Sequence, residues 1–160
     1  MIRAYVALGA NLGHPAATVR AALAALAGIP DTALAAASCL YRTAPLGLKN
    51  QPDFINAVAA VDTALAPFAL LDALFAIEAR FGRSRSVKNA PRTLDLDLLL
   101  YGETQMDEAR LTLPHPRMHQ RAFVLVPLAE LAPECRIPGY GELSELLASC
   151  RGQDVVRIEA

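Results

Sequence analysis

Short apolar stretches separated by turn-forming residues run through the chain, and they predict strands and helices in a regular order. Four stretches are interpreted as strands: residues 2–10, 34–41, 54–62 and 94–101. In the last one, a period of two divides the side chains between two faces. One face carries Asp95, Asp97, Leu99 and Tyr101, and the other carries Leu94, Leu96, Leu98 and Leu100. Since the leucine face is typical of a core, we expect this strand to be central in its sheet.

Two longer stretches predict helices, because each begins with proline and is followed by glycine. They cover residues 15–27 and 67–81. Apolar residues three or four positions apart give the second helix a buried stripe, which marks it as scaffold. Glu78, near the end of this helix, is either a partner that holds Arg83 or Arg85 in place or a plain surface charge.

The elements follow the order strand, helix, strand, strand, helix, strand, which fits a ferredoxin-like α+β sandwich with a mostly antiparallel sheet. After about residue 102 we expect extra C-terminal elements. They are brief pairing at 105–106, an extended segment over 110–113, a helical stretch over 122–131 interrupted at Pro127, a short helix over 142–148 and an edge strand over 155–158. No repeat or linker divides the chain, so residues 1–160 are expected to form a single domain.

Charge and hydropathy exclude several classes of protein. With 15 basic and 16 acidic residues the net charge is −1, so no global field attracts nucleic acid or an anionic membrane. No apolar run approaches the roughly 20 residues that span a bilayer, and the N-terminus lacks a signal-peptide layout. We expect a cytoplasmic monomer whose partners are small molecules. Cys39, Cys135 and Cys150 lack metal-ligand spacing and are expected to be small buried hydrophobes.

The most informative stretch is 88–99, where a basic loop runs into the strand with two aspartates. No acidic residue lies between Glu78 and Asp95, and the basic side chains before the strand suit a polyphosphate. Two strand residues span roughly 6.5 Å, so Asp95 and Asp97 can share one Mg²⁺ or bridge two ions about 3.5–4 Å apart. Substrate phosphates would complete such a site. The chemistry indicated is metal-assisted phosphoryl transfer, and the alternative is a solvated loop beside an aspartate pair.

This stretch resembles the signature of the 6-hydroxymethyl-7,8-dihydropterin pyrophosphokinases, folate-pathway enzymes that move diphosphate from ATP to a pterin alcohol. Segments 6–13, 41–47 and 113–115 match the same family in order, so the resemblance covers nearly the whole chain. It implies that the pterin hydroxymethyl oxygen attacks the β-phosphorus of ATP and that AMP leaves.

The resemblance also implies roles for individual residues. Asp95 and Asp97 would hold two Mg²⁺ ions, while Arg83 and Arg92 would stabilise developing charge. The residues expected to bind ATP are Arg85, Lys88, Arg92, Leu98, Arg110, Leu111, Thr112, His115 and Arg121. The residues expected to bind the pterin are Thr43, Ala44, Pro45, Leu46, Phe54, Asn56, Asp95 and Phe123.

Phe54 and Asn56 suit a pterin on chemical grounds as well, because a flat heterocycle needs an aromatic face and an amide at its rim. Core packing is the alternative for Phe54 and Phe123. Residues 82–91 are expected to form a mobile lid over ATP. The chain departs from the family pattern at Ala10, Phe75, Asn89 and Pro116, from which we expect altered affinities and an intact reaction.

Three other functions fit parts of the sequence. A ferredoxin-like sheet can bind RNA or nucleotides without catalysis, although aspartates on its presumed central strand would repel a phosphate backbone unless metal is present. A simple kinase or a metal-dependent nucleotidyltransferase could use the same aspartate pair. His115 and His119 are four residues apart, but further ligands for zinc are lacking within reach in sequence.

Overall fold

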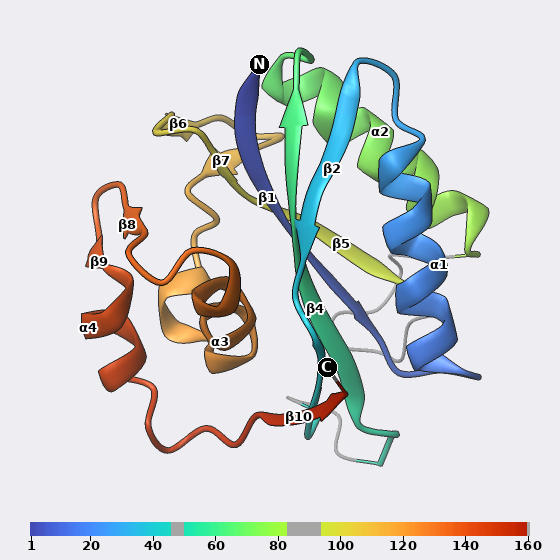
Figure 1. The fold of residues 1–160 in the computed structure, drawn as a ribbon, viewed down its shortest axis with the longest axis vertical. Coiled ribbons are helices and arrows are strands. Elements are labelled where there is room, and N and C mark those ends of the chain that lie inside the picture. Colours follow the sequence, from blue (N-terminus) through green and yellow to red (C-terminus); the bar gives the residue numbers. More distant parts are fainter. Residues whose placement is uncertain (46–49, 83–93, 160) are drawn as a thin grey trace.

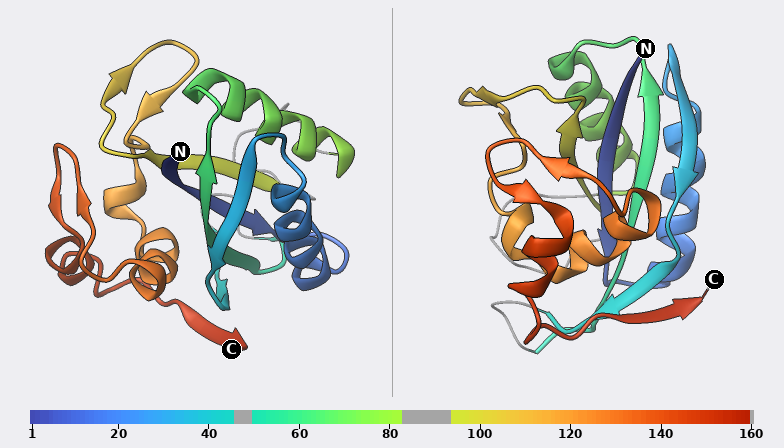
Figure 2. Two further views of the ribbon diagram at one scale, coloured as in Figure 1. Left: turned by 45° about the horizontal axis from the view of Figure 1, so that its top comes forward. Right: turned by 60° about the vertical axis from the view of Figure 1, so that its left-hand side comes forward.

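The computed structural model describes residues 1–45, 50–82 and 94–159, and it contains a six-stranded sheet covered by helices on both faces (Figures 1 and 2). The strands of this sheet are β1 (Ile2–Ala10), β2 (Thr32–Ala37), β3 (Leu40–Thr43), β4 (Phe54–Thr63), β5 (Asp95–Tyr101) and β10 (Val156–Glu159). Two small hairpins pair β6 (Met106–Asp107) with β7 (Thr112–Leu113), and β8 (Arg136–Ile137) with β9 (Gly141–Glu142). The helices are α1 (Pro15–Ala27), α2 (Pro67–Arg80), α3 (Ala122–Leu131) and α4 (Leu143–Ala148), with a 3₁₀ turn η1 (Met118–Gln120).

The sheet has the order β10-β3-β4-β1-β5, and β2 also pairs with β4. Every pairing in it is antiparallel. Helix α1 connects β1 to β2, and helix α2 connects β4 to β5, so two split βαβ units interlock. The predicted ferredoxin-like α+β sandwich is confirmed. None of the helices in the described part of the chain is long and apolar enough to cross a membrane.

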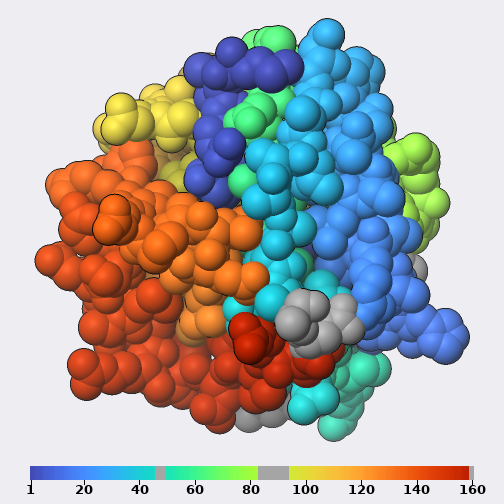
Figure 3. Space-filling view, viewed as in Figure 1, coloured from blue at the N-terminus to red at the C-terminus, as the bar shows by residue number. Residues whose placement is uncertain are grey.

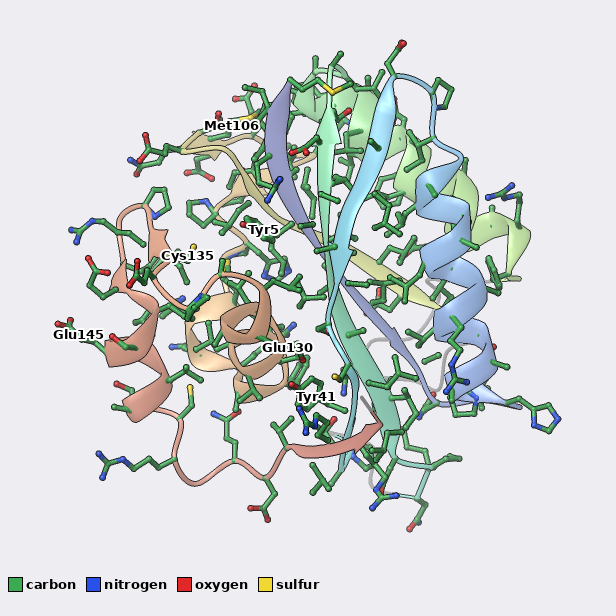
Figure 4. All side chains as sticks on the ribbon, in the orientation of Figure 1. Tyr5, Tyr41, Met106, Glu130, Cys135 and Glu145 are labelled. Atoms are coloured by element: carbon green, nitrogen blue, oxygen red, sulfur yellow. The ribbon has the colours of Figure 1, made fainter. Side chains whose placement is uncertain are left out.

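Alternation along the strands builds one hydrophobic core on each face of the sheet. Val6 and Leu8 of β1 point into the core under α1 and α2, together with the buried stripe of α2. Tyr5 and Ala7 point to the opposite face, where α3 and α4 cover the sheet. Figure 4 shows Tyr5 on that side. The C-terminal third of the chain therefore supplies the second layer, as the space-filling view shows for its orange and red segments (Figure 3).

The prediction that β5 is central was wrong, because β5 is an edge strand that pairs with β1 on one side. The leucines of β5 are nonetheless buried, since α2 covers one face of the strand and the C-terminal layer covers the other. Burial on both faces of a strand reports the layers above and below it. It says nothing about the neighbours in the plane of the sheet, which is why the pattern misled.

The predicted division of β5 into two faces holds only up to Leu98. The register with β1 shifts between Tyr5 and Val6, and this irregularity places both Leu99 and Leu100 in the core on the α3 side. Tyr101 consequently lies on the α2 side, where its hydroxyl donates to the Leu65 carbonyl at 2.6 Å. A β-bulge reverses the alternation after it, which a strict period of two cannot anticipate.

The strand predicted over 34–41 is divided into β2 and β3. Ser38 interrupts it by accepting a hydrogen bond from the Val58 N–H with its hydroxyl, at 2.9 Å. The next N–H, that of Cys39, donates to the carboxylate of Glu130 at the end of α3, at 3.0 Å. The Tyr41 hydroxyl donates to the same carboxylate at 2.7 Å, and Figure 4 shows these two side chains beside each other. The break thus becomes the point at which α3 is attached to the sheet.

The remaining predictions for the C-terminal region are mostly confirmed. The short pairing involves β6 and β7, although only Thr112–Leu113 of the predicted extended segment forms a strand. The expected short helix and edge strand are α4 and β10. Helix α3 continues through Pro127, so the predicted interruption was wrong; the proline is buried with its apolar neighbours, which offsets the loss of one helical hydrogen bond. Of the three cysteines, Cys150 alone is buried, while Cys39 and Cys135 are half-buried.

Candidate functional site

A pocket lies between the sheet and the start of α3. It is lined by Ala7, Leu8, Gly9, Thr43, Ala44, Phe54, Asn56, Asp95, Asp97, Arg121, Phe123 and Val124. Apart from Ala44, which follows β3, and Arg121, which precedes α3, these residues come from β1, β3, β4, β5 and α3, so both halves of the chain build the pocket. Seven of the eight residues predicted to bind a pterin are described, and all of them except Pro45 line this pocket.

The floor of this pocket holds a buried amide in a fixed orientation. The side-chain NH₂ of Asn56 donates to the Thr43 hydroxyl at 2.9 Å, and the two residues are only 5% and 8% exposed. They are diagonal neighbours on β4 and β3, where Tyr41 is the direct partner of Asn56. On the other side, a Cβ added to Gly9 would lie 3.2 Å from Oδ1, the side-chain oxygen of Asn56. Close packing against Gly9 and the Thr43 hydroxyl thus sets which way the amide faces.

The opposite wall of the pocket comes from the first turn of α3. Arg121 and Phe123 flank the first helical residue, and the Arg121 guanidinium lies 5.4 Å from the centre of the Phe123 ring. Phe54 contributes a second half-buried aromatic side chain to the lining. Phe54 and Phe123 therefore each present surface to the pocket, which the alternative of core packing alone does not explain.

A second pocket lies on the α2 side of β5. It is lined by Leu71, Phe75, Leu96, Asp97, Leu98, Ala109, Arg110, Leu111, Thr112, His115 and Pro116. Five of the predicted ATP-binding residues are in this set, as are two positions where the sequence departs from the family, Phe75 and Pro116. Asp97 lines both pockets. The two cavities therefore meet around the edge of one strand, a connection that a central strand would block.

His115 is a neutral imidazole at physiological pH. Burial, assisted by the positive charge of Arg121, lowers its pKa to about 4, and the charge of Asp95 opposes this only in part. Its Nδ1 accepts a hydrogen bond from the Arg117 N–H at 3.2 Å, which leaves the ring proton on Nε2. His115 therefore offers a hydrogen-bond donor without a positive charge. The zinc interpretation gains no support, since the neighbouring His119 stacks on Tyr140 with ring centres 4.0 Å apart.

Arg110 is held against α2. Its guanidinium forms an ion pair with Asp72 and lies 5.1 Å from the centre of the Phe68 ring. Both partners precede Phe75 on α2, so the loop between β6 and β7 is attached to the helix that forms the other wall of the second pocket.

Sequence reasoning missed the part played by Glu78. This residue is 2% exposed, and its carboxylate accepts a hydrogen bond from the Leu96 N–H at 2.7 Å. The interpretation as plain surface charge was wrong: Glu78 attaches α2 to β5 between the two aspartates of the strand. Its position on the buried stripe of α2, next to Ile77, is the one signal that pointed to burial.

Asp95 and Asp97 face the first pocket from adjacent positions on one side of β5, as predicted. Carboxylate oxygens are the ligands that Mg²⁺ prefers, so this pair fits the expected ion. Across the described residues no group of three or more histidine, cysteine, aspartate or glutamate side chains gathers as a metal site. Two carboxylates leave most coordination positions of Mg²⁺ to water and phosphate oxygens, which suits an ion that arrives with a nucleotide.

Several predicted site residues lie outside the described part of the chain: Leu46, Arg83, Arg85, Lys88 and Arg92. The departure at Asn89 and all of the proposed lid over 82–91 except Gly82 also lie outside the described residues.

Comparison with known proteins adds to this geometry. Residues 5–133 match the family model of 7,8-dihydro-6-hydroxymethylpterin-pyrophosphokinase (HPPK). A 2-amino-4-hydroxy-6-hydroxymethyldihydropteridine pyrophosphokinase of Pseudomonas aeruginosa is 53% identical over 156 residues, which cover 98% of this chain and 96% of that protein. The protein of the same name from Haemophilus influenzae is 43% identical over 158 residues, 99% of each chain.

Solved structures are similar at the level of the fold. A crystal structure of HPPK-DHPS in complex with substrates has a TM-score of 0.69 at 15% identity, covering 92% of this chain and 43% of that one. Wild-type HPPK-DHPS of Plasmodium falciparum with SDX-DHP also gives 0.69, at 13% identity, covering 93% of this chain and 43% of that one. This chain spans less than half the length of those proteins, and at such identities the similarity concerns the fold alone.

Proposed function

The chain belongs to the 7,8-dihydro-6-hydroxymethylpterin-pyrophosphokinase family, and from that premise we propose that its two adjacent pockets bring together the two substrates of diphosphate transfer. Its relatives are pyrophosphokinases by name, so the chain is an enzyme that transfers a diphosphate group in folate biosynthesis. We assign ATP as the donor, 6-hydroxymethyl-7,8-dihydropterin as the acceptor and AMP as the leaving nucleotide.

The first pocket is assigned to the pterin. A pterin has two flat faces and an edge rich in hydrogen-bond donors and acceptors. Phe54 and Phe123 supply aromatic surface, and the buried amide of Asn56 supplies a polar group of fixed orientation. Because that amide is held before any ligand binds, its ordering costs little on binding.

The second pocket is assigned to the nucleotide. Leu71 and Leu111 give it apolar walls that suit a purine base, and Leu98 lies on the edge strand, where main-chain groups can read the base. His115 presents a neutral donor there. From this pocket the phosphates would extend around β5 toward Arg121 on the far side.

Asp97 carries this proposal, because it belongs to both pockets. Asp95 and Asp97 would hold Mg²⁺ where the triphosphate passes from one pocket to the other; the bound ion would neutralise phosphate charge and favour ionisation of the attacking alcohol. The pterin oxygen loses its proton and forms a bond to the β-phosphorus. The bond between that phosphorus and the bridging oxygen of the α-phosphate breaks, and AMP departs with the oxygen. Roles for Arg83 and Arg92 in this step remain predictions.

The test is to mix the purified protein with ATP, Mg²⁺ and 6-hydroxymethyl-7,8-dihydropterin and to identify the nucleotide released. We expect AMP, and only when the pterin is present. Release of ADP would replace the proposal with simple kinase chemistry. Binding of ATP with no turnover would favour the non-catalytic nucleotide-binding alternative.

A further inference from the structure

The start of α3 is held by a residue from a different part of the chain. Arg121 is the N-cap of α3, yet it makes no capping hydrogen bond with its own side chain. Instead, the side-chain oxygen of Gln153 accepts a hydrogen bond from the Ala122 N–H at 3.0 Å. The side-chain NH₂ of Gln153 donates to the Gln120 carbonyl at 2.8 Å. A single amide therefore binds the main chain on both sides of Arg121.

Gln153 is itself well anchored. Its N–H donates to the carbonyl of Cys150 at 3.1 Å, and Cys150 is buried in the core on the α3 side. The Cys150 N–H in turn donates to the Leu147 carbonyl at 3.0 Å, in the turn that ends α4. Gln153 is exposed, but its main chain is held in the turn that follows α4, and its amide connects that turn to the first turn of α3.

The residues on either side of Ala122, whose N–H is held by Gln153, face the first pocket. Arg121 and Phe123, which precede and follow Ala122, both line it. A helix N-terminus without a cap frays, because its first N–H groups have no partners. Fraying here would displace the guanidinium and the aromatic ring together, since one turn of main chain carries both.

We propose that Gln153 is a positioning residue for the first pocket, the one assigned to the pterin. It fixes the first turn of α3 so that Arg121 and Phe123 meet the substrate without rearrangement. Gln153 touches no substrate in this scheme and acts through those two side chains. The inference rests on the proposed function, because it takes the first pocket to be the pterin site.

The experiment compares Gln153→Ala with wild type by calorimetric titration of the pterin, in the presence of Mg²⁺ and a non-hydrolysable ATP analogue, and by steady-state kinetics. Loss of a helix cap is worth about fivefold in an equilibrium constant, so we expect the pterin dissociation constant and KM to rise by about that factor. The affinity for the analogue alone should change less. Gln153→Glu keeps the acceptor for Ala122 but loses the donor to Gln120, and its effect should be intermediate. Asp154→Asn, at the exposed neighbouring position, is the matched control and should resemble wild type.

A double-mutant cycle separates positioning from general stability. Once Phe123→Ala has removed the ring, adding Gln153→Ala should weaken pterin binding by clearly less than fivefold. Full multiplication of the two effects, or wild-type affinity in Gln153→Ala, would overturn the inference while leaving the proposed function in place. Failure of the wild-type protein to bind the pterin would remove both. If Gln153→Ala does not fold, the same cycle with Gln153→Glu decides.

Discussion

At the scale of single residues, the pterin binding proposed for the first pocket depends on the orientation of one amide. Asn56 can present either its oxygen or its NH₂ group to a ligand, and these have opposite hydrogen-bonding character. The Thr43 hydroxyl accepts from the NH₂ group and so leaves the oxygen facing the other way. Thr43 was predicted as a pterin contact, and the structure shows that its side chain also binds Asn56.

Replacing Thr43 by valine keeps the shape of the side chain and removes the acceptor. Leaving a buried NH₂ group without a partner costs about 1–3 kcal/mol, so we expect the pterin KM of Thr43→Val to rise about tenfold with little change in the ATP KM. Thr43→Ser should restore most of the affinity. Steady-state kinetics with each substrate varied in turn provides the measurement.

The matched control for this change is Thr63→Val. The Thr63 hydroxyl is also buried and pairs with the Thr32 hydroxyl at 2.7 Å, outside either pocket. This variant should lose stability while the pterin KM stays unchanged. Equal KM values for Thr43→Val and wild type would show that the amide needs no such partner.

At the scale of elements, carboxylates attach two helices to the main chain of the sheet, one at a strand and one at the break between two strands. Glu78 of α2 binds the N–H of Leu96, and Glu130 of α3 binds the N–H of Cys39. The Leu96 N–H belongs to edge strand β5 and the Cys39 N–H to the break between β2 and β3, and each finds its acceptor on a helix. Such bonds fix helix against sheet more sharply than apolar packing, which permits sliding.

The Glu130 attachment makes part of the stability dependent on pH. Partial burial opposes ionisation of Glu130, but hydrogen bonds from Tyr41 and Cys39 outweigh it, so the pKa of the carboxyl is lowered from its ordinary 4.5. A lowered pKa stabilises the fold above about pH 4.5, and the contribution disappears as pH falls through the folded-state value. We expect the free energy of unfolding of wild type to drop more between about pH 7 and pH 3 than that of Glu130→Gln.

Urea denaturation across this pH range measures the difference. Glu134→Gln, which alters an exposed carboxyl close to the end of α3, serves as the control and should follow the wild-type curve. Parallel curves for wild type and Glu130→Gln would mean that the charge of Glu130 contributes nothing to stability.

The element pattern was largely predictable because it depends on local rules. Proline in the first turn and glycine after the last turn gave predicted bounds for α1 and α2 that are close to the observed ones. Apolar patterning did the same for β1 and β4. What sequence alone missed was non-local: the bulge at Leu99 and Leu100, and the division of one predicted strand at Ser38 and Cys39. Each depends on a partner far away in sequence, which periodicity within one segment does not contain.

At the scale of the whole molecule, the proposed function puts the reaction where the two faces of the sheet meet. The first pocket, which we assign to the pterin, opens on the α3 side, the second pocket, which we assign to the nucleotide, opens on the α2 side, and Asp97 at the edge strand belongs to both. Through the family resemblance, the sequence implied a pterin role for six residues of the first pocket and an ATP role for five residues of the second. It could not show that they lie on opposite sides of β5, because that follows from the strand order.

Removal of the Asp97 carboxylate should therefore affect catalysis much more than folding. Asp97 faces a pocket and is only half-buried, so we expect Asp97→Ala to lose about 100-fold or more in kcat, on the scale of removing one charge-stabilising group. The melting temperature should change little. Asp107→Ala, at an exposed position on β6, is the control. Near-normal turnover of Asp97→Ala at saturating Mg²⁺ would contradict the metal assignment.

The edge position of β5 also bears on which substitutions could make this enzyme resistant to an inhibitor. Leu96 turns its N–H away from β1 toward Glu78, and in an antiparallel pair the main-chain groups of Leu98, two residues on, point to the same side. A compound that binds those groups in the second pocket depends on peptide atoms that every amino acid except proline possesses. A substitution at Leu98 by any other residue would leave them in place, so resistance would have to arise elsewhere, for example at the side chains of Phe75 or Pro116.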